Sequence, residues 1–125
     1  MDAQNIEIHT RVVGVTHVPG YPHETLYPIR DAMDQTFPGY RSKRLAAVIV
    51  PNPQTVYDAN AREVHVPAID KMIGHLPRQI AERIRSFEYL GYAVTQAEIT
   101  GVRVHPDNPD NPGVDVIVKM RREEQ

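Results

Sequence analysis

The chain has 125 residues, of which 41% are apolar and 24% charged, and its net charge is −2. This length is enough for one hydrophobic core, so a single domain over residues 1–125 is expected. The chain has no cysteine, which excludes disulfides and zinc–thiolate sites. Its first residues lack the pattern of a signal peptide, and its longest apolar run is too short to cross a bilayer. We therefore expect a cytoplasmic protein with no membrane partner.

Eleven prolines and seven glycines divide the chain into short stretches, a pattern that favours strands joined by turns. Residues 11–18 are predicted to form a strand, because Val13 and Val15 alternate with smaller or polar residues. Residues 28–37 have apolar side chains at helical spacing after a proline, which predicts a short helix. The next stretch, 45–50, is apolar throughout, which predicts a central strand.

The second half of the chain continues in the same way. Alternating apolar and polar residues predict a strand over 62–66, and a short strand over 71–75 follows it. Residues 77–90 carry apolar side chains on one helical face and charged ones on the other, and Gly91 ends this helix. The last two strands are expected over 92–102 and 114–120.

These elements contain too few helices for a sheet wound from strand–helix–strand units. The expected fold is mainly β with one or two helices, arranged as a small OB/SH3-like antiparallel β-barrel. Its core is expected over about 11–119, with frayed ends at 1–5 and 121–125.

Three short motifs follow one another along the chain. The first is VVGVT at 12–16, and the second is VPNP at 50–53 followed by YDANA at 57–61. The third is IGHLPR at 73–78, which opens the predicted second helix. Together they resemble the HIRAN domain in its free-standing bacterial or phage form, over about 11–119.

The resemblance implies an OB-like barrel that binds the 3′ end of single-stranded DNA, without catalysis and without a cofactor. It places Tyr57 as the ring that stacks on the terminal base and Asp58 as the acceptor for the free 3′ hydroxyl. It places His75 and Arg78 near the phosphates. Some family members are joined to helicase-like translocases, so a helicase or nuclease partner is also expected.

The chemistry of these residue types agrees with those roles. A carboxylate beside DNA phosphates is repelled unless it accepts a hydrogen bond, and only a strand end offers a free hydroxyl. A stacked aromatic ring contributes about 1–3 kcal/mol per base. Arg78 stands at the start of the predicted second helix, where free N–H groups also favour an anion.

The chain departs from the family pattern at two places that belong to the predicted site. Thr55 and Val56 stand where the family often has Asn-Pro before the Tyr-Asp pair. Thr16 and His17 stand where DNA-binding members place Arg-Tyr, so His17 would form one wall of the base sandwich. The predicted DNA-binding residues are therefore Thr16, His17, Thr55, Tyr57, Asp58, His75 and Arg78.

Each of these assignments has a structural alternative. Residues 57–60 have the composition of a simple turn. His75 could bond a nearby carbonyl, and Arg78 could belong to a solvated helix face. At the level of function, the alternative is a protein-interaction adaptor that keeps the barrel and does not bind DNA. The acidic net charge favours it.

Metal binding and catalysis have little support. None of the six histidines is spaced as a helical metal pair and no acidic cluster joins them, so no metal is expected. The chain has no phosphate-binding glycine loop and no nucleophile motif, so the protein is not expected to be an enzyme.

Overall fold

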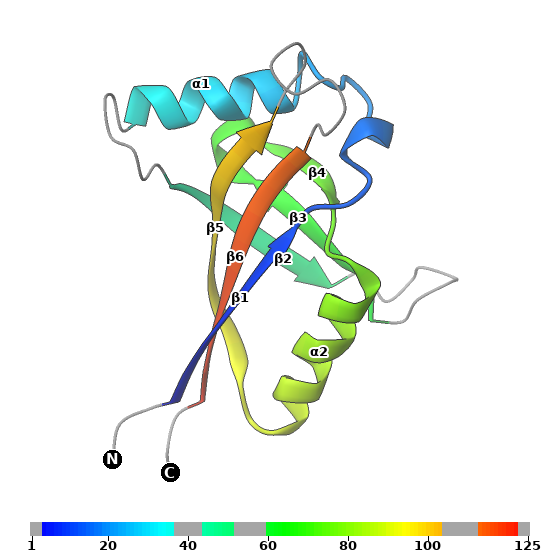
Figure 1. Cartoon of the computed structure of the whole chain (residues 1–125), viewed down its shortest axis with the longest axis vertical. Helices are drawn as coiled ribbons and strands as arrows, with labels where there is room; N and C mark the ends of the chain where they lie inside the picture. Colours follow the sequence, from blue (N-terminus) through cyan, green and yellow to red (C-terminus); the bar gives the residue numbers. More distant parts are fainter. Residues whose placement is uncertain (1–3, 37–43, 52–59, 104–112, 123–125) are drawn as a thin grey trace.

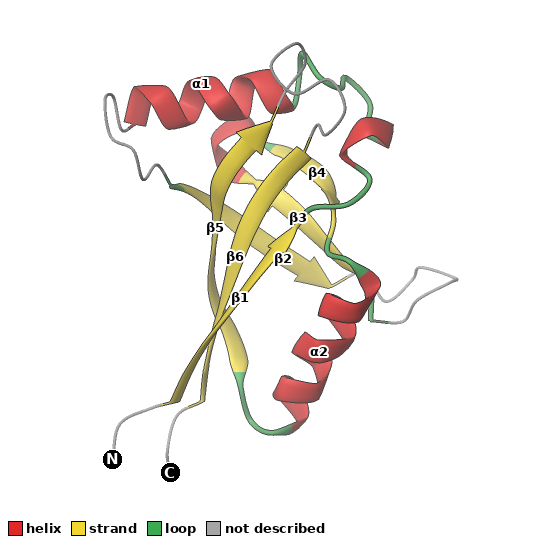
Figure 2. Cartoon of the chain, in the orientation of Figure 1, coloured by secondary structure: helices red, strands yellow, loops and turns green. Residues whose placement is uncertain are grey.

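The computed structural model describes residues 4–36, 44–51, 60–103 and 113–122. Within these ranges six antiparallel strands form one sheet, in the order β1-β6-β5-β2-β3-β4 (Figure 1). The strands are β1 (Gln4–Arg11), β2 (Leu45–Pro51), β3 (Arg62–Val66), β4 (Lys71–His75), β5 (Ala93–Arg103) and β6 (Gly113–Arg122). Two α-helices, α1 (Leu26–Thr36) and α2 (Arg78–Tyr89), and two 3-10 turns, η1 (Val15–His17) and η2 (Pro67–Ile69), complete the described elements (Figure 2). The predicted mainly β, antiparallel character is confirmed.

The strand β2 pairs with different neighbours along its two halves. Residues Leu45, Ala46 and Ala47 pair with β5, whereas the rest of the strand pairs with β3. The apolar run 45–50 is therefore central, as predicted. It is not buried on both faces, because Ala46 and Val48 are exposed.

The sheet is not closed into the expected β-barrel. In the described residues, the two edges of the sheet meet at a single antiparallel bridge between Val13 and His75, which exchange N–H···O bonds of 2.8 and 2.9 Å. The next pair in this register would join Arg11 to Pro77, and proline has no N–H to donate. On the other side Val15 has already entered η1. Closure thus stops after one residue pair.

The predicted first strand, 11–18, is wrong. The strand lies earlier, at β1. Beyond it, the Val12 N–H still donates to the Val114 carbonyl of β6, and Val13 forms an isolated bridge to His75. Val12 and Val15 are buried, while Val13 is 44% exposed. Gly14 explains the change, because its φ of 80° is in the left-handed region and turns the chain into η1.

The chain ends that were expected to fray include paired residues. Gln4 lies opposite Arg122, and Asn5 lies opposite Arg121. The β1–β6 ladder therefore extends beyond the predicted core of 11–119 at its Gln4–Arg122 end. The side chains of these outer pairs are exposed or half-buried, so backbone pairing rather than core packing holds them.

The two helices agree with prediction to within a few residues. Leu26, Ile29 and Met33 of α1 are buried, as are Ala81 and Ile84 of α2. Most of these side chains join the inner face of the sheet in one core. Burial of large apolar side chains contributes about 1.5–3 kcal/mol each. The helices therefore cover the sheet and hold the segments near its edges in place.

Candidate nucleic-acid interface

Three of the predicted site residues, Thr55, Tyr57 and Asp58, lie outside the described residues, in the range 52–59. The strands on either side of that range are described: β2 ends at Pro51, and β3 begins at Arg62. The other four predicted residues, Thr16, His17, His75 and Arg78, can be placed.

The Val13–His75 bridge brings two of the three motifs together. It lays the segment that continues into η1 beside the turn between β4 and α2. Gly74 makes this approach possible, because a Cβ at that position would lie 2.5 Å from the Val13 carbonyl oxygen. Its φ of 151° is also one that other residues rarely adopt.

A surface depression of about 490 Å³ lies at this junction. We call it the edge depression. Its described lining residues are Thr10, Arg11, Val12, Val13, Gly14, Val15, Thr16 and Pro77. Thr16 therefore lies in a hollow next to the start of α2. His17 is exposed but does not line this hollow.

His75 and Arg78 lie on either side of Pro77. The backbone of His75 makes the bridge to Val13, and its side chain is half-buried. Arg78 is exposed and forms an ion pair with Glu82, its Nε lying 3.4 Å from a carboxylate oxygen. The pair is at the predicted i, i+4 spacing on α2.

The start of α2 is not capped by a side chain. Pro77 occupies the cap position and has no acidic residue after it in the first turn. The first N–H groups of a helix have no partner within the helix, and together with the helix dipole they favour an anion. The edge depression thus borders a helix start without a carboxylate in its first turn.

A second depression, of about 380 Å³, lies along the other half of α2. We call it the arginine depression. The described residues that line it are Pro51, Asn60, Ala61, Arg62, Arg85, Glu88 and Tyr89. Sequence reasoning did not identify it as a site. The sequence feature that could have indicated it is the alternation of β3, which puts Arg62 on the same inward face as Val64 and Val66.

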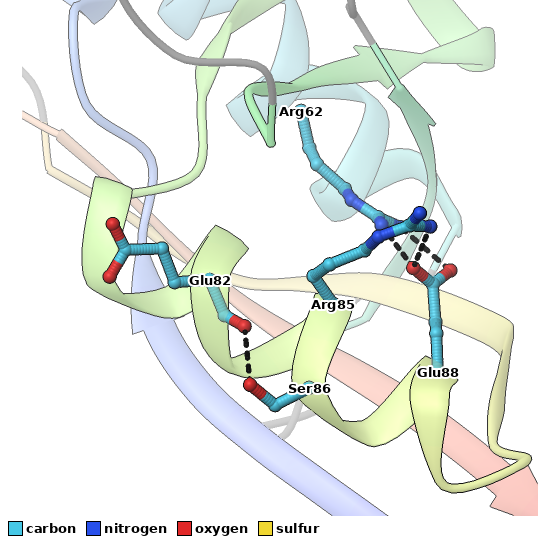
Figure 3. A network of polar contacts seen from close by, with 5 residues as sticks. All are labelled: Arg62, Glu82, Arg85, Ser86 and Glu88. Carbon is cyan, nitrogen blue, oxygen red and sulfur yellow. Dashed lines mark hydrogen bonds and ion pairs between the residues drawn. The ribbon is translucent and has the colours of Figure 1, made fainter.

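Arg62 and Glu88 form the centre of this depression (Figure 3). The guanidinium of Arg62, a residue only 6% exposed, donates two hydrogen bonds to the Glu88 carboxylate. The hydrogen bonds from Arg62 lower the pKa of Glu88, and burial opposes them in part. The Arg85 side chain points toward the same carboxylate, with 3.6 Å between the nearest charged atoms (Figure 3).

Arg85 also contacts an aromatic ring. Its guanidinium carbon lies 4.7 Å from the centroid of the Tyr89 ring, a distance typical of a cation–π contact. Tyr89 is 76% exposed, so much of the ring is open to solvent. The arginine depression therefore combines two guanidinium groups, one carboxylate and one exposed ring.

Comparison with family models, curated proteins and solved structures found no match to this chain. In the described part of the chain, no three acidic or histidine side chains are grouped as metal ligands would be. No helix there is both long and apolar enough to cross a membrane.

Proposed function

We propose that the protein is a non-catalytic module that binds single-stranded DNA at the edge depression, with the 3′ end of the strand as its preferred ligand. The observation that carries the proposal is the Val13–His75 bridge. It places Thr16 from the first motif beside the turn that holds His75 and Pro77 from the third. Residues that are distant in sequence and that carry the family resemblance thus surround one open hollow.

The physical chemistry of that hollow supports an anionic strand. An uncapped helix start supplies N–H groups, and Arg78 adds a positive charge next to them. In the described residues, the β1 and β4 edges of the sheet are joined only by the Val13–His75 bridge. The edge depression beside this bridge offers space for a narrow ligand, where a closed barrel would have further backbone pairs. The resemblance adds Tyr57 for stacking and Asp58 for the terminal hydroxyl, in an OB-like arrangement of the HIRAN type.

The test measures the affinity of short fluorescent oligonucleotides by anisotropy at low salt. Tyr57→Ala and Asp58→Ala are expected to weaken binding, the first by at least about fivefold because stacking contributes about 1–3 kcal/mol. Replacing the 3′ hydroxyl with a 3′ phosphate is expected to weaken binding to the unaltered protein. The same replacement should make little difference to Asp58→Ala, because its acceptor is already gone.

Equal affinity for free and blocked 3′ ends would refute end recognition. Equal affinity for duplex and single strands would refute the single-strand preference. Both variants need an unchanged melting temperature for the comparison to hold. Asp31→Ala is the matched control for Asp58→Ala, because Asp31 is exposed on α1 and does not line the edge depression.

A second candidate function is a protein-interaction adaptor. The net charge of −2 favours it, because general DNA binders carry a basic excess. If no oligonucleotide of any length shifts in a low-salt gel, the adaptor is the better explanation. A helicase or nuclease partner would then be sought by pull-down with the whole chain.

A further inference from the structure

The exposed flank of α2 connects the two depressions. Arg78, Arg85 and Tyr89 are separated by seven and four residues, which places them on one side of a helix with 3.6 residues per turn. All three are exposed. Arg78 follows Pro77 of the edge depression, and Arg85 lies about 10.5 Å further along the axis at 1.5 Å per residue. Arg85 and Tyr89 line the arginine depression.

The arginine depression carries a surplus of positive charge. The Glu88 carboxylate is bound by both hydrogen bonds from Arg62, so that pair is neutral. Arg85 contributes a second guanidinium to the same carboxylate from 3.6 Å. Two cations beside one anion leave one net positive charge, and it is on the more exposed member, Arg85. An anion that reaches this depression therefore meets a guanidinium whose charge is not fully balanced.

The Tyr89 ring supplies a surface for a flat ligand. Arg85 lies against the ring, which holds it in place through the cation–π contact. With 76% of the residue exposed, the ring retains open area on which a base can stack. A cation and a free aromatic surface, one helical turn apart, are the two groups that a nucleotide needs for its phosphate and its base.

We propose that a DNA strand whose 3′ end lies in the edge depression continues along α2 in its 5′ direction. A phosphate further from the 3′ end then binds Arg85, and the base of the same nucleotide stacks on Tyr89. This inference rests on the proposed function, and it extends the binding surface beyond the residues of the three motifs. The strand then follows the helix axis from Arg78 toward Gly91. A strand too short to reach Arg85 binds only at the edge depression.

Glu82 is the feature that opposes this path. It lies between Arg78 and Arg85 on α2, and its carboxylate points away from the Arg62–Glu88 group (Figure 3). It partly neutralises Arg78 through their ion pair. Removing its charge with Glu82→Gln therefore frees Arg78 and reduces repulsion of a strand along α2, so affinity for a long strand should rise.

The experiment compares a trinucleotide with an octanucleotide, both with a free 3′ hydroxyl, by anisotropy on the whole chain. Arg85→Ala and Tyr89→Ala are expected to weaken octanucleotide binding at least about fivefold each and to leave trinucleotide binding unchanged. Arg85→Ala should also reduce the slope of log affinity against log salt by about 0.7, as expected for one lost phosphate contact. Arg83→Ala is the matched control, because Arg83 is exposed on the opposite flank of α2 and does not line the depression.

The outcomes separate this inference from the proposed function. If both lengths bind and neither variant weakens the longer one, the path along α2 is wrong and end binding survives. If Arg83→Ala has the same effect as Arg85→Ala, the charge acts without a defined site and the inference fails. If neither oligonucleotide binds the unaltered protein, the proposed function fails and this inference fails with it. Tyr89→Ala keeps the test decisive should Arg85→Ala disturb Glu88, because Tyr89 is largely in solvent.

Discussion

Glu88→Gln tests how strongly the buried arginine of β3 depends on its partner in α2. The change keeps the size of the side chain but replaces one carboxylate oxygen with an NH2 group, which faces the donors of Arg62. Hydrogen bonds to charged groups contribute about 1.5–3 kcal/mol each, and breaking a fully buried ion pair costs about 3–5 kcal/mol. Glu88 has 27% of its side chain exposed, so water offsets part of the loss. We expect the variant to lose about 2–4 kcal/mol of unfolding free energy.

The expected loss can be measured as a change in melting temperature by calorimetry or circular dichroism. Unfolding entropy of about 2.1 cal/mol/K per residue converts 1 kcal/mol into about 4 °C for a chain of this length, so we expect a drop of about 8–15 °C. Glu82→Gln is the control, because the exposed Arg78–Glu82 pair contributes about 0.5 kcal/mol or less. Equal drops in the two variants would refute the reasoning, since they would show that burial of Arg62 adds nothing.

Two other predictions concern acid stability and the bridge. Because the pKa of Glu88 is lowered in the folded state, its contribution is fully present above its ordinary pKa of 4.5 and is lost as pH falls toward the lowered value. The difference in melting temperature between the unaltered chain and Glu88→Gln should therefore be constant near neutral pH and shrink below about pH 4.5; a constant difference down to about pH 3 would contradict this sign. Gly74→Ala should cost about 2 kcal/mol or more in urea unfolding, because it combines a strained φ with a Cβ only 2.5 Å from the Val13 oxygen. Gly14→Ala, where φ is 80° but nothing lies within 4 Å of the added Cβ, should cost about 1 kcal/mol, and a larger loss there than at Gly74 would show that the close approach is unimportant.

Much of the fold could be predicted because local patterns were unambiguous. The strand β3 and the helix α2 match their expected ranges closely, since strict alternation and helical spacing each admit one burial pattern. The first strand was misplaced because the valine-rich segment 12–15 is more apolar than β1, whose alternation rests on Ile6 and Ile8 alone. Pairing with β6 along its whole length decides the position of β1, and that information is not local.

The candidate site, too, could be predicted from the sequence only in part. The meeting of Thr16 with the turn after His75 could be expected only from the resemblance, because a single backbone bridge between distant residues leaves no periodic signal. The bond between Arg62 and Glu88 was hidden for the same reason, since the two residues are 26 positions apart. An inward-facing arginine in a strand does indicate a buried cation, and a buried cation requires a carboxylate nearby. The identity of that carboxylate depends on how α2 packs.

The pairing of β1 with β6 has a practical consequence for the experiments above. Since Gln4 lies opposite Arg122, both described ends of the chain leave the molecule at the same pole (Figure 1). The 3-10 turn η1 lies toward the opposite pole (Figure 1). A fluorophore or an immobilisation tag attached at Gln4 or Arg122 would thus start away from the edge depression, and a surface that captures the protein there would leave the depression open to an oligonucleotide.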